Sequence, residues 1–267
     1  MKKYFLLALS LLLSVSEVLA VEYGPLQDTS IGNETRYTFV LVHGASGGGW
    51  DWRTIDDLLT SDGHTVYRPT LTGLGERAHL SSPDIDLSTH VLDIINIILF
   101  EGLQDIVLVG HSYGGMVITG VMDAVPERIK HAIFLDAAVP GDGMSAQDVW
   151  GEKPAWFGVE NGMMYFNWLD PDAPLPRDVP QSLKTYTEPV SFNNPAAVLL
   201  PATYIAFVAP GQAAERRSSD SSWLRAEERD WVIRTLDSGH NAQRSHPQEL
   251  AAMLEAAPDD KNHKVSP

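Results

Sequence analysis

Residues 108–115 of the chain read LVGHSYGG, and this stretch decides the fold. An apolar run typical of a buried strand leads directly into a serine in the pattern G-x-S-x-G, and the spacing predicts a helix over residues 116–124. The turn is so tight that positions 110 and 114 have no room for bulky side chains, and both hold glycine. The pattern predicts a strand–turn–helix that presents the Ser112 hydroxyl beside the N-terminal N–H groups of the helix. A glycine-rich turn with an incidental serine is the alternative.

Short apolar runs alternate with amphipathic segments on both sides of this turn. This alternation indicates an α/β fold, in which a parallel sheet is covered by helices on both faces. Strands are expected at residues 37–42, 64–68, 105–109, 132–135, 203–208 and 231–236. Helices are expected at residues 50–60, 88–100 (with Ser88 as its cap), 116–124, 219–229 and 247–256.

Residues 137–201 interrupt the alternation with a long irregular stretch that is rich in aromatic residues. Such an insertion is typical of a cap over a site. We expect Trp150, Trp156 and Phe166 to line a substrate pocket beneath it. The alternative is that these rings form only the small core of the cap, and the sequence leaves both interpretations open.

Composition restricts the classes of partner. The 267 residues include 19 Lys and Arg against 35 Asp and Glu, which gives a net charge of −16. This balance argues against binding to nucleic acid or to an anionic membrane, since both need a positive partner. The absence of cysteine excludes disulfides, thiolate metal sites and cysteine nucleophiles. None of the nine histidines shows a metal-binding spacing, so no metal is expected.

Residues 1–20 have the composition of a targeting segment. Lys2 and Lys3 precede an apolar run over residues 4–15, which is too short to cross ~30 Å of hydrocarbon. Residues 18–20, VLA, fit a signal peptidase site. We expect export to the periplasm or the extracellular space, without stable insertion in a membrane. The expected division is a signal peptide at 1–20, a leader at 21–36, one domain at 37–257 with a cap at about 138–201, and a disordered tail at 258–267.

A serine hydroxyl is a weak nucleophile at neutral pH and needs a base. His240 lies in a glycine-containing loop after the last expected strand and is the candidate, with an ordinary surface histidine as the alternative. Residues 44–48, GASGG, also fit G-x-S-x-G, but no helix begins at once after them. That loop instead predicts half of an oxyanion hole, formed by the backbone N–H groups of Ala45 and Tyr113.

Together these motifs resemble the α/β-hydrolase superfamily over about residues 37–256. The resemblance rests on HG at 43–44, TLTGLGER at 70–77, GHSYGG at 110–115, FLDA at 134–137 with VP at 139–140, and SGH at 238–240. The run at 70–77 is specific to the small esterases related to plant methylesterases and hydroxynitrile lyases, a branch that includes bacterial pyrethroid-type carboxylesterases.

This resemblance implies six parallel strands and a serine esterase for small to medium, mostly apolar esters, with no cofactor. A lactonase, a lyase-like enzyme and a non-catalytic binder of small molecules stay open as alternatives. The resembling lyases carry Lys just after the histidine, whereas Asn241 stands there in this chain, which favours hydrolysis.

The acid that would orient His240 has more than one candidate. In the superfamily its usual place is the loop after the strand at 203–208, but residues 209–212, APGQ, hold no carboxylate. Asp136 ends the strand that follows the nucleophile strand and keeps the chain order Ser, Asp, His, so it is our prediction. The other candidates are carboxylates further along the chain: Glu215, Asp220 and, too close to the ring in sequence to reach it easily, Asp237.

Overall fold

The computed structural model describes residues 35–152, 155–209, 211–212 and 214–259, although not the side chains of residues 214–216. The expected signal peptide, nearly all of the leader and most of the tail lie outside these residues. Within the described part, no helix has both the length and the apolar character needed to cross a membrane.

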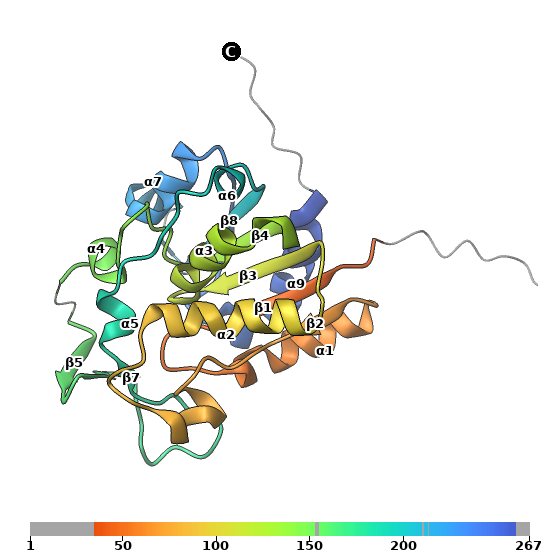
Figure 1. Ribbon diagram of the computed structural model, residues 1–267. Helices are drawn as coiled ribbons and strands as arrows, with labels where there is room; N and C mark the ends of the chain where they lie inside the picture. The colour runs from red at the N-terminus through yellow and green to blue at the C-terminus, as the bar shows by residue number, and fades with distance from the viewer. Residues whose placement is uncertain (1–34, 153–154, 210, 213, 260–267) are drawn as a thin grey trace, which may run out of the picture. The chain divides into compact units, whose positions relative to one another are not determined.

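A six-stranded parallel sheet forms the centre of the fold, in the order β2-β1-β3-β4-β8-β9 (Figure 1). Every neighbouring pair in it is parallel, as the sequence predicted. The strands are β1 (Thr38–Val42), β2 (Thr65–Tyr67), β3 (Ile106–His111), β4 (Ile129–Leu135), β8 (Ala202–Val208) and β9 (Val232–Asp237). Because the strands are parallel, the loops that follow them meet at one edge of the sheet.

Helices cover both faces of this sheet, which explains why the strands read as continuous apolar runs. Along β3, Ile106 and Leu108 belong to the core packed by α2 and α3, whereas Val107 and Val109 belong to the core packed by α1 and α9. The main helices are α1 (Arg53–Ser61), α2 (Leu87–Phe100), α3 (Gly114–Ala124), α7 (Ser221–Glu228) and α9 (Pro247–Ala256). The short elements between them are η1 (Gly49–Trp52), η2 (Gly75–Leu80), η3 (Pro126–Arg128), η4 (Ala214–Ser219), α8 (Ala242–Ser245) and η5 (Ala257–Asp259).

The cap of α2 differs from the prediction. The helix begins at Leu87, and the Asp86 carboxylate accepts a hydrogen bond from the backbone N–H of Thr89 at 2.8 Å. Ser88 is already inside the first turn, and its hydroxyl donates to Glu188 at 2.7 Å. Both residue types are good caps, so the position of the first turn decided between them.

The insertion after β4 is more ordered than the predicted irregular stretch. It contains α4 (Ala146–Trp150), α5 (Lys184–Thr187), α6 (Pro195–Val198) and an antiparallel sheet of β5 (Phe157–Glu160), β6 (Met163–Phe166) and β7 (Gln181–Ser182). Asn161 and Gly162 join β5 to β6 with φ values of 51° and 77°. An Asn-Gly pair with positive φ is the preferred two-residue hairpin turn, so this hairpin has a local sequence signal that was not used for prediction.

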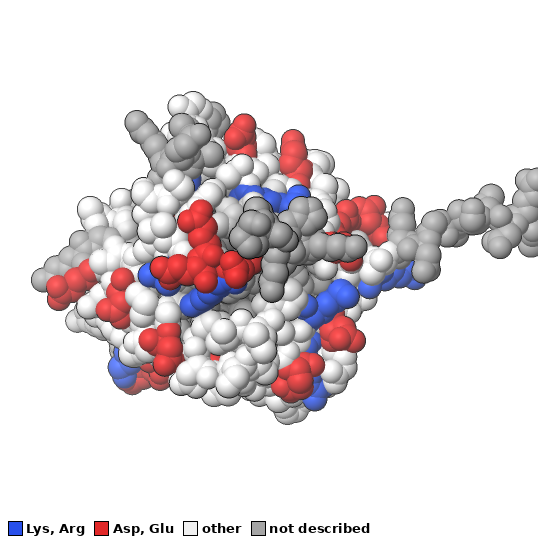
Figure 2. All heavy atoms as spheres, turned by 90° about the horizontal axis from the view of Figure 1, so that it is seen from above, with Lys and Arg blue, Asp and Glu red and all other residues white. Residues whose placement is uncertain are grey.

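Acidic residues are spread over the face of the molecule that Figure 2 shows. The Lys and Arg side chains visible there lie in smaller groups beside Asp and Glu. Among the described residues in that view, acidic side chains therefore interrupt the basic ones, in keeping with the net charge of −16.

Candidate active site

The turn between β3 and α3 holds Ser112 in a left-handed backbone conformation, with φ of 54°. A Cβ atom at Gly110 would lie 2.8 Å from the carbonyl oxygen of Gly114, and one at Gly114 would lie 2.8 Å from that of Val42. Only glycine fits at either position without moving the backbone. Steric crowding therefore explains the glycines that flank the serine.

His240 lies in the loop between β9 and α8 and is hydrogen-bonded to Ser112. Its Nε2 atom is 2.9 Å from the Ser112 Oγ atom. The carbonyl oxygen of His240 accepts a hydrogen bond from His111 Nε2 at 2.7 Å. Burial, reinforced by the nearby His240, lowers the pKa of His111 to about 4, so that ring is neutral at pH 7. No role for His111 was predicted from the sequence, yet its side chain fixes the loop that carries the candidate base.

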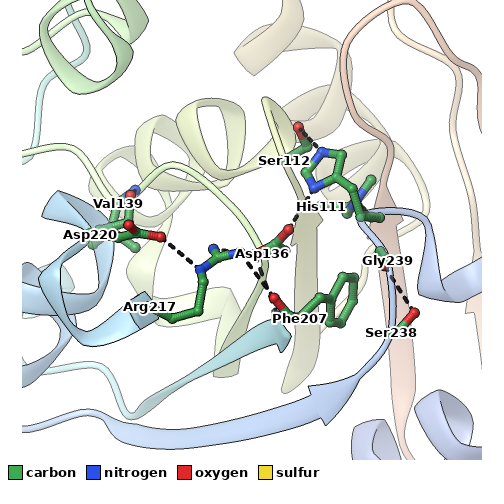
Figure 3. Close-up of polar contacts among 11 residues, drawn as sticks. His111, Ser112, Asp136, Val139, Phe207, Arg217, Asp220, Ser238 and Gly239 are labelled. Atoms are coloured by element: carbon green, nitrogen blue, oxygen red, sulfur yellow. Dashed lines mark hydrogen bonds and ion pairs between the residues drawn. The ribbon is translucent and has the colours of Figure 1, made fainter. Parts of the chain in front are cut away.

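Asp136 lies at the end of β4, and its carboxylate is divided between two partners (Figure 3). Its Oδ2 atom is 2.6 Å from His240 Nδ1, and its Oδ1 atom is 2.5 Å from Arg217 Nη2. The backbone N–H of Phe207 also donates to Oδ1, at 3.4 Å. Burial alone would raise the pKa of Asp136, but the His240 hydrogen bond and the positive charges of His240 and Arg217 outweigh it and lower that pKa.

The other candidate acids lie elsewhere. The Asp220 carboxylate is 2.7 Å from Arg217 Nε, on the side of the guanidinium away from Asp136 (Figure 3). Asp237 ends β9 with an exposed side chain. The side chain of Glu215 lies outside the described residues. Of the predicted acids, Asp136 is therefore the one that the structure brings to the His240 ring.

A buried histidine orients the loop that carries Ala45. His43 Nδ1 donates to the carbonyl oxygen of Gly44 at 2.8 Å, and its Nε2 accepts from the backbone N–H of Leu71 at 3.1 Å. The C=O and N–H groups of a trans peptide point in opposite directions, so this contact turns the Ala45 N–H away from His43. Within the described part of the chain, the N–H groups of Ala45 and Tyr113 have no hydrogen-bond partner. Both residues line the cavity described below, so two donors are available there.

The run at 70–77 supports both halves of this arrangement. Besides the Leu71 bond to His43, the carbonyl oxygen of Thr72 accepts from His90 Nε2 at 3.0 Å. His90 Nδ1 accepts from the Tyr113 hydroxyl at 2.9 Å. Burial lowers the pKa of His90 to about 4, which keeps the ring neutral and able to accept that bond. Residues 70–77 therefore supply hydrogen bonds that hold both His43 and His90 in place.

Ser46 has a different environment from Ser112. It is buried, and its hydroxyl accepts a hydrogen bond from the Trp168 indole N–H at 3.0 Å. Its backbone N–H donates to the Gln181 side chain at 2.9 Å, and its carbonyl accepts from the Val179 N–H at 2.9 Å. Ser46 therefore ties the insertion to the loop after β1.

A cavity of about 650 Å³ opens over Ser112 and His240. Trp150, Trp156 and Trp168 form its aromatic wall. Phe166, predicted to line it, is instead buried and stacked against Trp168, with ring centroids 4.7 Å apart. Side chains alternate along β6, and Phe166 shares the buried side with Met164, so the rings contribute both to a wall and to a small core.

The cavity also has a charged corner. Asp51 forms a short ion pair with Arg244 and accepts a hydrogen bond from Gln243 at 2.9 Å. The Arg244 guanidinium lies 4.8 Å from the centre of the Trp50 ring. Burial raises the pKa of Asp178, which also lines the cavity. Asp51 lies in η1 and Arg244 in α8, which are far apart in the sequence, so no local sequence pattern predicts this pair.

No group of three or more His, Cys, Asp or Glu side chains in the described residues is arranged to hold a metal ion.

The sequence of this chain is similar to known proteins of one family. Residues 39–253 match the model of the alpha/beta hydrolase family. The carbendazim hydrolyzing esterase of Nocardioides sp. (strain SG-4G) is 36% identical over 245 residues, which span 82% of this chain and 98% of that protein. Methylesterase 1 of Arabidopsis thaliana is 35% identical over 130 residues, which span 46% of this chain and 49% of the plant protein.

Solved structures agree with these matches at the level of the fold. A pyrethroid hydrolase from Sphingobium faniae JZ-2 superimposes with a TM-score of 0.67 at 19% identity, over 84% of this chain and 98% of that one. An extracellular alpha/beta-hydrolase from a Paenibacillus species gives a TM-score of 0.65 at 22% identity, over 84% of this chain and all of that one (100%). The resemblance read from the sequence motifs is confirmed.

Proposed function

The chain belongs to the alpha/beta hydrolase family, and on this premise we propose that it is a serine esterase that hydrolyses small to medium, mostly apolar carboxylic esters. The observation that supports this best is the hydrogen-bonded series from Asp136 through His240 to Ser112, with distances of 2.6 and 2.9 Å. The names of two relatives, carbendazim hydrolyzing esterase and methylesterase 1, support ester hydrolysis as the class of reaction.

Acylation begins with Ser112. Its Oγ attacks the carbonyl carbon of the ester while His240 Nε2 takes the hydroxyl proton. Asp136 remains ionised, keeps the Nδ1 proton facing it and stabilises the imidazolium. The negative charge on the carbonyl oxygen is held by the N–H groups of Ala45 and Tyr113, aided by the N-terminus of α3.

Acylation ends when the tetrahedral intermediate collapses: the bond to the alcohol oxygen breaks, and His240 Nε2 gives that oxygen its proton. Deacylation then repeats these steps with water. Water then enters, loses a proton to His240 and attacks the acyl carbon. The acid leaves and Ser112 recovers its proton. No cofactor takes part in the proposed steps.

The cavity restricts the substrate. Three tryptophan rings favour apolar groups on the ester, and about 650 Å³ suits a small to medium molecule. A lactone presents the same carbonyl and is accepted by the same mechanism. A hydroxynitrile-lyase-like reaction is less well supported, because Asn241 lines the cavity where the resembling lyases carry a cation.

The proposal extends to the N-terminal segment. We propose that residues 1–20 are a cleaved signal peptide and that the mature enzyme is exported, on the evidence of the two lysines, the apolar run and the VLA sequence. N-terminal sequencing of protein from the culture medium or periplasm, expected to begin at Val21, tests this.

A panel of p-nitrophenyl esters of increasing acyl length, with lactones and aromatic methyl esters beside them, tests the function. We expect hydrolysis of short and medium acyl chains and covalent labelling of Ser112 by a fluorophosphonate. Labelling without turnover of any ester would indicate another substrate class. Neither labelling nor turnover would favour a non-catalytic binder.

A further inference from the structure

Arg217 occupies the region after β8 in which the superfamily usually carries the catalytic acid. It lies in η4, and its guanidinium contacts several polar groups. Nη2 is 2.5 Å from Asp136 Oδ1, Nη1 donates to the carbonyl oxygen of Phe207 at 3.0 Å, and Nε is 2.7 Å from Asp220 Oδ2. Figure 3 shows Arg217 between the two carboxylates. The planar fork of arginine suits such an arrangement, whereas the single ammonium of lysine does not.

The partial burial of Arg217 and Asp136 strengthens the attraction between their charges. The Asp136 side chain is 6% exposed and that of Arg217 is 24% exposed. Charges that are partly withdrawn from water interact more strongly than charges on an open surface. The carboxylate that faces His240 is therefore shared with a permanent cation, and Asp220 partly offsets that cation.

We propose that Arg217 and Asp220 act as a positioning pair, which holds the Asp136 carboxylate against His240 and places two opposite charges behind it. This inference rests on the proposed function, in which His240 is the base. A positive charge near an imidazole ring disfavours its protonated form, so removal of the Arg217 charge should favour the imidazolium of His240. The Asp220 carboxylate acts in the opposite direction.

Other charged groups around His240 do not change when this pair is altered. The His111 ring lies 4.8 Å from the His240 ring, measured between centroids. Asp51, Asp178 and Arg244 line the same cavity. Because these groups stay constant across variants of Arg217 and Asp220, a change in the His240 titration reports on the pair.

The pair makes predictions of opposite sign for the pKa of His240. Arg217→Gln removes the cation and should raise that pKa by about 0.5–1 unit. Asp220→Asn leaves the cation without its offset and should lower the pKa, by about 0.3 unit. Arg217→Lys retains the charge, so the pKa should stay within about 0.2 unit of the wild-type value while kcat falls because the fork is lost.

Two measurements on the full chain provide the test. The pKa of His240 is followed by NMR in protein with 15N-labelled histidine, and the acid limb of kcat/KM for a p-nitrophenyl ester is measured in parallel. The NMR measurement needs no turnover, so it tests the pair even if the proposed function fails. Arg128→Gln is the matched control, since Arg128 also pairs with a neighbouring acid, Glu127 at 3.6 Å, but precedes β4 at the opposite end of the sheet.

Opposite shifts in Arg217→Gln and Asp220→Asn, with no shift in Arg128→Gln, support the inference. Shifts below about 0.2 unit in both, or shifts in the same direction, overturn it, even if the melting temperature falls. Should Arg217→Gln fail to fold, Asp220→Asn and Arg217→Lys still decide the question, because the Asp220 side chain is 45% exposed.

Discussion

Two pentapeptides in this chain, GASGG at 44–48 and GHSYG at 110–114, fit the same pattern and have different surroundings. Both central serines have a left-handed backbone, with φ of 62° at Ser46 and 54° at Ser112. The hydroxyl of Ser112 is 2.9 Å from His240 Nε2, whereas that of Ser46 is buried and accepts a hydrogen bond from Trp168. The two serines thus share a backbone conformation and differ in the hydrogen-bond partner of the hydroxyl oxygen.

The difference follows from what comes after each serine. Ser112 is followed by α3, which is 11 residues long, and it comes directly after β3, a strand in the middle of the sheet. Ser46 is followed by the short helix η1, of four residues. A helix of three turns supplies an N-terminus directed at the site, and a single short turn does not. A pentapeptide pattern therefore has meaning only together with the elements that flank it.

The largest effect is expected when the hydroxyl of Ser112 is removed, with removal of the Ser46 hydroxyl as the comparison. Ser112→Ala should lower kcat by about 10⁶-fold, as in serine hydrolases in which the nucleophile is lost. Ser46→Ala should lower kcat by less than about tenfold, because its hydroxyl is bonded to Trp168 and not to His240. Steady-state hydrolysis of a p-nitrophenyl ester measures both. Equal losses would contradict the assignment of the two serines.

The second test removes the acid that supports only one of the serines. Asp136→Asn should lower kcat by about 10³–10⁴-fold at neutral pH, because an amide favours the wrong tautomer of His240. Asp237→Asn, an exposed acid three residues before the histidine, is the control and should stay near wild-type activity. An active Asp136→Asn variant beside an inactive Asp237→Asn variant would move the acid to the other residue.

The third test uses pH, since the second pentapeptide contains His111 where the first contains Ala45. The pKa of His111 is about 4 in the folded protein, below the ordinary value of 6.5, so the unfolded chain binds its proton more readily. The stability associated with neutral His111 is present above pH 6.5 and is lost as pH falls towards 4, by about 3 kcal/mol at most.

Urea unfolding at several pH values measures this loss. His111→Gln keeps a donor for the His240 carbonyl but cannot titrate, so its stability should change less between pH 6.5 and 4. The same pH dependence in this variant and the wild type would show that other groups cause the acid lability.

The fourth test concerns the stability supplied by Ser46. Loss of its hydroxyl leaves the Trp168 N–H without a partner and should lower the free energy of unfolding by about 1–2 kcal/mol. Ser61→Ala, at an exposed serine, should change it by less than about 0.5 kcal/mol. Urea unfolding followed by tryptophan fluorescence compares them, and no difference between the two variants would argue against a role for Ser46 in holding the insertion.

The smallest effect should come from the aromatic residues of the insertion. Trp156→Ala removes part of the cavity wall and so enlarges the cavity. It should change the relative kcat/KM of short and long acyl chains by about tenfold. Phe166→Ala removes a ring that packs behind that wall, so it should lower stability with little change in preference. The p-nitrophenyl series gives the preference profile, and identical profiles for Trp156→Ala and the wild type would assign that ring to the core alone.

The parts that sequence reasoning predicted well depend on local pattern. Continuous apolar runs such as residues 105–109 predicted buried parallel strands, and the flanking glycines predicted the turn at Ser112. The cap at Asp86 and the hairpin at Asn161 were misjudged or overlooked although their signals are local. Phe166 was expected in the pocket lining or in the core of the insertion, and it packs behind Trp168; the sequence could not decide, because the side that faces a cavity depends on where β6 packs.

The parts that could not be predicted depend on contacts between distant residues. Arg217 meets Asp136 across 81 positions of sequence, and Arg244 meets Asp51 across 193. A surface arginine and a site arginine look the same in sequence, since burial and partners alone distinguish them. Trp168 entered the cavity wall for the same reason, through its contact with Ser46 on another loop.

The left-handed backbone at the site has a consequence for laboratory evolution. Ser46, Ser112 and Asp136 all have positive φ, which costs a residue with a side chain about 1 kcal/mol relative to glycine. Ser112→Gly would therefore relieve strain while abolishing the nucleophile. A selection for heat resistance alone would tend to enrich such inactive variants. Improving this protein by directed evolution therefore requires that turnover be measured in every round, alongside thermal stability.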